Sequence, residues 1–156
     1  MIVGGACLNL YGIKRTTEDT DIWIDPSREN WSKLIEVVEL LGYSESEISR
    51  LENAYTLNAF VFTMIGPIDI MNYADKRLQF NSVYARCLVF TYEDININAL
   101  SLPDLREMKA LARRPIDVSD VHKIDDFMAA NNQPRLDKRS RPQKWWDRAK
   151  LIWKAG

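Results

Sequence analysis

The sequence has no apolar run long enough to cross a membrane. Of its 156 residues, 46% are hydrophobic and 28% are charged, the ordinary balance of a globular domain. No run approaches the ~20 apolar residues that a spanning helix needs. Met1 is followed directly by IVGG, without a basic leader and an apolar core, so we expect no signal peptide. These absences predict a cytoplasmic protein that makes no membrane contact.

Cysteine and histidine are scarce. Cys7 and Cys87 both stand in apolar surroundings, where a buried free thiol is commoner than a disulfide or a ligand. The single histidine, His122, lies in the charged stretch SDVHKIDD, and we expect it at the surface. The sequence therefore does not indicate redox chemistry, and we assign no general base to histidine.

Charge is almost balanced overall but unevenly distributed. The net charge is -1, yet residues 133–156 contain eight Lys or Arg and two Asp, a net charge of +6. Trp145, Trp146 and Trp153 lie among these basic residues. Such a segment can bind nucleic acid through phosphate contacts and stacking. It can also dock on its own domain or on a second subunit, the interpretation that we favour.

The patterns of apolar residues predict an α/β (α+β) domain over residues 1–130 and a basic extension over 131–156. We expect helices at 6–11, 28–41, 76–86, 101–114, 118–130 and 143–156, and strands at 2–4, 19–25, 55–65, 67–73 and 87–94. Ser27 and Ser101 are the expected helix N-caps. We assign the apolar stripe of the 28–41 helix to the core, namely Trp31, Leu34, Ile35, Val38 and Leu41.

Acidic residues interrupt two of the expected strands. Asp19 and Asp21 alternate along one strand, so their side chains share a face and lie ~6.6 Å apart along it. Asp69 stands between two isoleucines in a later strand. Carboxylates gathered on one face repel each other, which favours either a divalent cation or a solvated strand edge. Three carboxylates on neighbouring strands can hold magnesium, completed by water and substrate phosphates.

A glycine pair precedes these acids. Gly4 and Gly5 predict a turn in which the backbone can approach a ligand closely. The expected helix after the turn would present N–H groups to a phosphate. A phosphate-binding turn followed by a cluster of carboxylates describes a nucleotide site.

The order of these parts resembles the nucleotidyltransferase superfamily related to DNA polymerase beta. Gly4-Gly5 is followed after 13 residues by Asp19-Thr20-Asp21, and Asp69 supplies the later acid. The stretch GGACLNLYGIKRTTEDTDIWI looks like small bacterial nucleotidyltransferase-like proteins and AbiE-type toxins. The stretch SLPDLREMKALARRPIDVSDV is similar to their downstream segment. The resemblance covers about residues 2–127.

The resemblance implies a nucleotidyltransferase fold, a mixed sheet with flanking helices. It also implies transfer of a nucleoside monophosphate from a nucleoside triphosphate, such as ATP, to an acceptor hydroxyl, with pyrophosphate leaving. The acceptor is an RNA, a protein or a small molecule, and the biological setting is a toxin–antitoxin or phage-defence system. The alternative is an inactive nucleotide-binding or interaction module with the same fold.

The resemblance also implies roles for single residues. Asp19, Asp21 and Asp69 would be the catalytic acids and the ligands of Mg²⁺ or Mn²⁺, with Asp69 helping to activate the acceptor hydroxyl. Gly4 and Gly5 would cradle the triphosphate.

Further motif residues carry two interpretations each. Arg15 and Thr17 contact phosphate or nucleotide, or they order the loop. The first interpretation of Lys109 is that it neutralises the charge of a phosphate, and the second is that it is a solvated lysine on a helix surface. Asp117 and Asp120 match the last segment of the motif, but a helix start favours acids for capping and dipole reasons alone, the interpretation that we favour for both residues.

Overall fold

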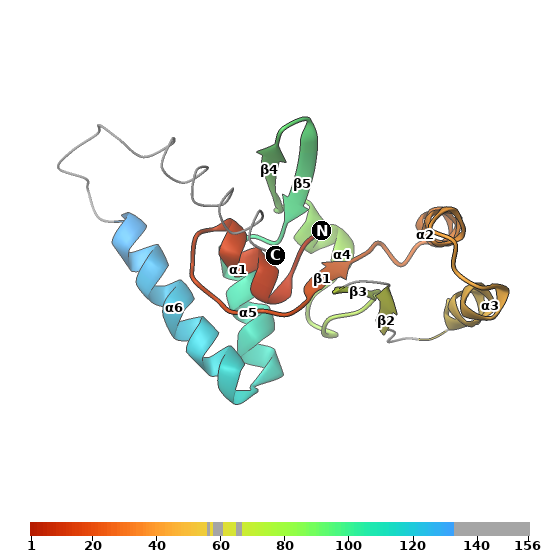
Figure 1. Ribbon diagram of the computed structural model, residues 1–156. Helices are drawn as coiled ribbons and strands as arrows, with labels where there is room; N and C mark the ends of the chain where they lie inside the picture. The colour runs from red at the N-terminus through yellow and green to blue at the C-terminus, as the bar shows by residue number, and fades with distance from the viewer. Residues whose placement is uncertain (56, 58–60, 65–66, 133–156) are drawn as a thin grey trace.

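The computed structural model describes residues 1–55, 57, 61–64 and 67–132. This part of the chain is a mixed α/β structure with a three-stranded sheet, a two-stranded hairpin and flanking helices (Figure 1). The predicted extension over 131–156, including its terminal helix, lies outside the described residues from 133 onward. No helix in the described part is long and apolar enough to span a membrane.

The sheet consists of β1 (Thr20–Trp23), β2 (Val61–Met64) and β3 (Ile68–Met71) in the order β1-β3-β2. The central strand β3 runs parallel to β1 and antiparallel to β2. The predicted mixed sheet is therefore confirmed. Strands β1 and β3 are each shorter than the stretch that predicted them.

The hairpin is formed by β4 (Leu88–Tyr92) and β5 (Ile95–Ala99), and it projects from the rest of the structure (Figure 1). Ile2 bridges both Ile22 and Ala99, so the first residues join the hairpin to the sheet. The predicted strand at residues 2–4 is reduced to these isolated bridges of Ile2, because Gly4 already begins a helix. The sequence did not predict β5.

The two faces of the sheet differ because side chains alternate along each strand. Ile22, Ile70 and Phe62 lie on one face, in a cluster with α2 (Arg28–Leu40) and α3 (Glu45–Ala54). The opposite face carries Asp21, Asp69 and Thr63 in register across the three strands. The acids are thus on the face away from the apolar α2 and α3 packing.

Helix α2 begins and ends where the sequence predicted. The Ser27 side chain accepts a hydrogen bond from the Asn30 backbone N–H at 3.4 Å, and Trp31 is buried. The prediction for Leu41 was wrong, since this C-cap residue is 57% exposed beyond the end of the packed stripe. Helix α3 was not predicted, although Ser44 and Glu47 form a capping box at its start.

Four further helices surround the second core cluster: α1 (Gly4–Leu10), α4 (Phe80–Tyr84), α5 (Leu102–Ala112) and α6 (Pro115–Asn132). Ser101 caps α5 by accepting a hydrogen bond from the Asp104 N–H, as predicted. Helices α5 and α6 pack side by side (Figure 1), and Trp23 of β1 is 1% exposed among them. This core fixes the segment that carries the acids.

Candidate metal and nucleotide site

Strands β1 and β3 bring the three predicted acids together. Asp21 and Asp69 are direct partners in the parallel register, and Asp19 immediately precedes β1. One carboxylate oxygen from each residue lies within 4.8 Å of those from the other two. Asp19 is exposed and the other two acids are half-buried, so solvent and a ligand can reach the cluster.

These carboxylates have no cationic partner among the residues that the structure describes. No Lys or Arg side chain in that part forms an ion pair with them. The pKa of Asp21 is raised, first by burial and then by the negative charges of Asp19 and Asp69, which Lys109 and Arg114 counteract only in part. The cluster thus has an excess of negative charge that a bound cation would relieve.

Gly4 is required by its contact with Asp21. The Val3 N–H donates to the Asp21 carbonyl at 3.0 Å, which holds the following residue against β1. Gly4 has φ +65°, and a Cβ at this position would lie 1.9 Å from Asp21 Oδ2. The close backbone approach that the sequence predicted therefore involves the acid itself.

Gly5 makes room for the loop that orients Asp19. A Cβ on Gly5 would lie 2.7 Å from Thr17 Oγ1. The Thr17 hydroxyl donates to Asp19 Oδ1 at 3.0 Å, and Asn9 exchanges two hydrogen bonds with the Arg15 backbone. These contacts support the loop-ordering interpretation of Arg15 and Thr17.

A second acidic cluster lies between α5 and α6. Asp117 and Asp120 are fully buried. Lys109 Nζ lies 2.9 Å from Asp117 Oδ1 and 3.0 Å from Asp120 Oδ2. Arg114 Nε is 2.6 Å from Asp117 Oδ2, and Arg15 Nε is 3.2 Å from Asp120 Oδ1. Each of the two acids is therefore paired with two cations.

These pairs correct the simpler interpretations of the motif. Lys109 is only 5% exposed, so it is not a solvated helix lysine. Helix capping does not account for Asp117 either. Burial raises the pKa of this acid, but hydrogen bonds from Arg114 and Lys109 outweigh burial and leave the pKa below its usual value. Asp117 is therefore ionised and holds both cations in place.

A cavity of about 220 Å³ is lined by one acid from each cluster, Asp21 and Asp117. Gly4 and Asp21 line one part of it, and Lys109, Arg114 and Asp117 line another. The Arg114 side chain is 68% exposed although its guanidinium is bound to Asp117. Sequence reasoning did not select Arg114 as a site residue. Its place three residues before Asp117, directly before α6 begins at Pro115, was the available signal, since a side chain just before a helix can meet one in the first turn.

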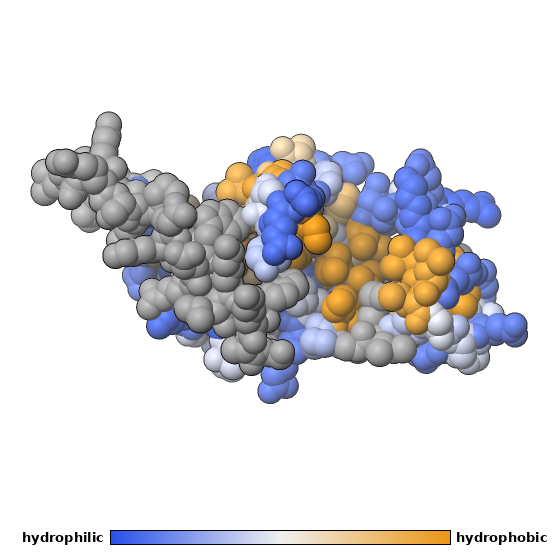
Figure 2. Space-filling model, turned by 45° about the horizontal axis from the view of Figure 1, so that its top comes forward, coloured by the Kyte–Doolittle hydropathy of each residue, from blue (hydrophilic) through white to orange (hydrophobic). Residues whose placement is uncertain are grey.

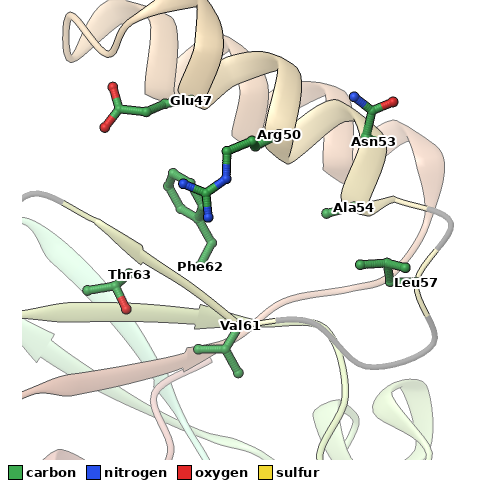
Figure 3. A pocket seen from close by; sticks show the side chains of 8 residues that line it. All are labelled: Glu47, Arg50, Asn53, Ala54, Leu57, Val61, Phe62 and Thr63. Atoms are coloured by element: carbon green, nitrogen blue, oxygen red, sulfur yellow. The ribbon is translucent and has the colours of Figure 1, made fainter.

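A larger cavity of about 680 Å³ lies between α3 and the edge strand β2 (Figure 3). Phe62 points toward α3, whereas Val61 and Thr63 point to the other side of the sheet (Figure 3). The charged groups in its lining are the single carboxylate of Glu47 and the single guanidinium of Arg50. The three carboxylates at β1 and β3 could hold a metal ion, whereas this cavity has only one carboxylate, so we place the candidate site at the three acids.

Cys7 and His122 lie where the sequence predicted, whereas Cys87 is less buried than predicted. Cys7 and Cys87 are free thiols, with Cys7 buried and Cys87 half-buried. Burial raises the pKa of Cys7 to about 12, so this thiol stays protonated at neutral pH. His122 is exposed. The reactive groups at the site are thus carboxylates.

The chain matches no protein-family model, no curated protein and no solved structure. Its likeness to the nucleotidyltransferases rests on the motifs in the sequence. The argument for function accordingly rests on the geometry of the site.

Proposed function

We propose that the chain is a metal-dependent nucleotidyltransferase with the nucleotidyltransferase fold. It transfers a nucleoside monophosphate from a nucleoside triphosphate to an acceptor hydroxyl. The observation that carries this proposal is the convergence of Asp19, Asp21 and Asp69, each of which places a carboxylate oxygen within 4.8 Å of those of the other two. Gly4 lies against this cluster.

The donor set fits a hard divalent cation. All three side chains offer carboxylate oxygens, which Mg²⁺ and Mn²⁺ prefer over the softer ligands that other metals select. The raised pKa of Asp21 supports the fit, because burial and the two neighbouring carboxylates disfavour its charge in the metal-free chain. When bound, the ion would neutralise phosphate charge and stabilise the attacking and leaving oxygens.

The chain itself orients the reactants in this proposal. The acceptor oxygen forms a bond to the α-phosphorus, the bond to the β-phosphate oxygen breaks, and pyrophosphate leaves. Asp69 takes the proton of the acceptor hydroxyl. Thr17 holds Asp19 in position through its 3.0 Å hydrogen bond. Arg114, which lines the cavity beside Asp21, supplies positive charge for the triphosphate.

One observation favours the alternative of an inactive nucleotide-binding module. Lys109, the lysine expected to neutralise phosphate, already has both Asp117 and Asp120 as partners. In the active enzyme Lys109 would act through the electrostatic field and by positioning the acids. In an inactive module Lys109 would only stabilise the fold, through its ion pairs with the two acids.

Label transfer separates the two functions. Each of the four nucleoside triphosphates is labelled at the α-phosphate and incubated with the protein and either Mg²⁺ or Mn²⁺. Three acceptor fractions are added in separate reactions: bacterial RNA, protein and small molecules. We expect label in one fraction together with released pyrophosphate. The Asp19→Asn and Asp21→Asn double variant should transfer none. Glu18→Gln, which alters an exposed acid beside the cluster, is the matched control.

The outcomes distinguish the hypotheses. Transfer by the wild type and by Glu18→Gln, and not by the double variant, supports the enzyme. Binding of a triphosphate without transfer to any fraction favours the inactive module. Equal transfer by the double variant would contradict the assignment of the acids.

A further inference from the structure

The β4/β5 hairpin has one apolar face and one largely polar face. The register pairs Phe90 with Ile97 and Tyr92 with Ile95, and side chains directly opposite each other share a face. The apolar face contains Leu88, Phe90, Tyr92, Ile95, Ile97 and Ala99. The other face contains Val89, Thr91, Asn96 and Asn98.

The core covers only part of the apolar face. Ala99 is buried, and Phe90 packs edge-on against Tyr11 with ring centroids 5.2 Å apart. Ile95, next to the turn, is 63% exposed and Leu88 is 49% exposed. The hairpin points toward the viewer in Figure 2, with a hydrophilic tip and apolar residues beside it. A two-stranded hairpin is marginal in water unless its apolar face is packed.

The chain continues for 24 residues after α6 ends at Asn132. In the last part of that segment, Trp146, Lys150 and Trp153 recur at helical spacing. A helix over this part of the sequence would carry both tryptophans on one face.

Charge also favours a contact between this segment and the hairpin. Residues 143–156 contain four Lys or Arg and one Asp, a net charge of +3, and the hairpin turn consists of the exposed acids Glu93 and Asp94. Basic residues around an aromatic stripe can therefore meet acids at the edge of an apolar face.

The end of α6 lies within reach of the hairpin. Met128 of α6 packs against the same core cluster as Phe90, a cluster that also contains Tyr11. Residues 133–142 can span at most ~33 Å when extended. The segment can therefore reach the hairpin of its own chain.

We propose that residues 143–156 dock on the apolar face of the β4/β5 hairpin of the same chain. Trp146 and Trp153 cover Ile95 and its neighbours on that face, and the basic side chains lie near Glu93 and Asp94. This contact makes the basic extension part of the domain. It is independent of the proposed transferase activity.

Hydrogen–deuterium exchange of the full chain tests the contact. Ile95→Lys places on the apolar face a charge that also repels the basic segment, and we expect exchange of residues 143–156 to accelerate at least tenfold. Val89→Lys is the matched control, because Val89 is 59% exposed on the opposite face of the same hairpin. It should change exchange of the segment less than twofold.

A reciprocal variant guards against local unfolding of the hairpin. Trp146→Ser combined with Trp153→Ser leaves the hairpin sequence intact and should accelerate exchange of residues 88–97. Lys138→Ser, outside the aromatic stripe, should not.

Three results would overturn the proposal. The first is unprotected exchange of residues 143–156 in the wild type. The second is protection that increases with protein concentration together with a dimer mass in light scattering, which would assign the contact to a second copy. The third is protection that appears only when RNA is added, which would assign the segment to nucleic-acid binding.

Discussion

The protein contains two clusters of aspartates, and they differ in whether nearby Lys and Arg side chains neutralise their negative charge. Asp117 and Asp120 are fully buried, and Lys109, Arg114 and Arg15 lie within ion-pair distance of them. Asp19, Asp21 and Asp69 are open to solvent in part, and no cation of the described residues pairs with them. The first cluster is electrostatically complete within the chain, whereas the second is not.

The pKa values of Asp117 and Asp21 are shifted in opposite directions. The pKa of Asp117 lies below its usual value because hydrogen bonds from Arg114 and Lys109 outweigh the effect of burial. The pKa of Asp21 is raised by burial and by its two acidic neighbours. Acids that the chain neutralises stabilise the fold, and acids that it leaves unneutralised are available to an external cation.

The largest expected effect is on stability, from removal of an acid in the neutralised cluster. Asp117→Ala leaves the buried Lys109 with one of its two partners, which should lower the free energy of unfolding by about 3–5 kcal/mol. Urea denaturation measures the change. Asp125→Ala removes a half-exposed ion pair with Arg106 and should lower the free energy of unfolding far less than Asp117→Ala, because solvent screens the pair. Equal costs for the two variants would remove the distinction between the clusters.

The next effect is on metal binding, from the unneutralised cluster. Asp21→Asn should weaken Mn²⁺ binding in the presence of a triphosphate at least a hundredfold, about 2.7 kcal/mol, as measured by electron paramagnetic resonance. The urea midpoint of the metal-free protein should stay the same or rise, because a repulsive charge is lost. A weaker fold with unchanged Mn²⁺ affinity would reverse the roles that we assign to the two clusters.

Glycine substitutions separate backbone strain from contact with the acid. Gly4 and Gly42 both have positive φ, but a Cβ on Gly42 would meet no atom within 4 Å. Gly42→Ala should therefore cost about 1–2 kcal/mol of stability through strain, with no change in Mn²⁺ affinity. Gly4→Ala should cost more and weaken Mn²⁺ binding about tenfold, since a methyl group would displace the Asp21 carboxylate. Identical behaviour of the two variants in both assays would refute the contact.

The smallest effect is a pH dependence. The pKa of Asp21 is raised from 3.8 in the folded chain, so the folded state holds this proton more tightly than the unfolded state. Ionisation therefore costs stability as the pH rises from below 3.8 through the raised pKa. In metal-free buffer, Asp21→Asn should gain stability relative to the wild type across that interval, and the gain should then level off. A gain that is independent of pH would contradict the cause that we give.

The sequence predicted the three acids as candidates because the signal around each is local, whereas their convergence depends on the pairing of β1 with β3. The alternation of Asp19 and Asp21 with apolar residues predicted a lined strand, and two isoleucines around Asp69 predicted another. Ser27 and Ser101 likewise marked helix starts through side-chain contacts three residues away. Each of these features depends on neighbours in the chain.

The ion pairs could not be predicted in the same way. Lys109 meets Asp120 only because α5 and α6 pack side by side, and Arg15 reaches Asp120 from 105 residues away. Helix α3 was overlooked although Ser44 and Glu47 carry a capping-box pattern. Strand β5 was overlooked because Glu93 and Asp94 form its turn without glycine, and Glu93 has φ +51°.

The measurement that tests the central claim most directly is calorimetric titration of the four nucleoside triphosphates with Mg²⁺. The titrations use the wild type, the Asp19→Asn and Asp21→Asn double variant, and Glu18→Gln. We predict Mg²⁺-dependent binding of at least one triphosphate to the wild type and to Glu18→Gln, and none to the double variant. Absence of binding to the wild type at millimolar triphosphate, or equal binding to the double variant, would contradict a metal and nucleotide site at these carboxylates.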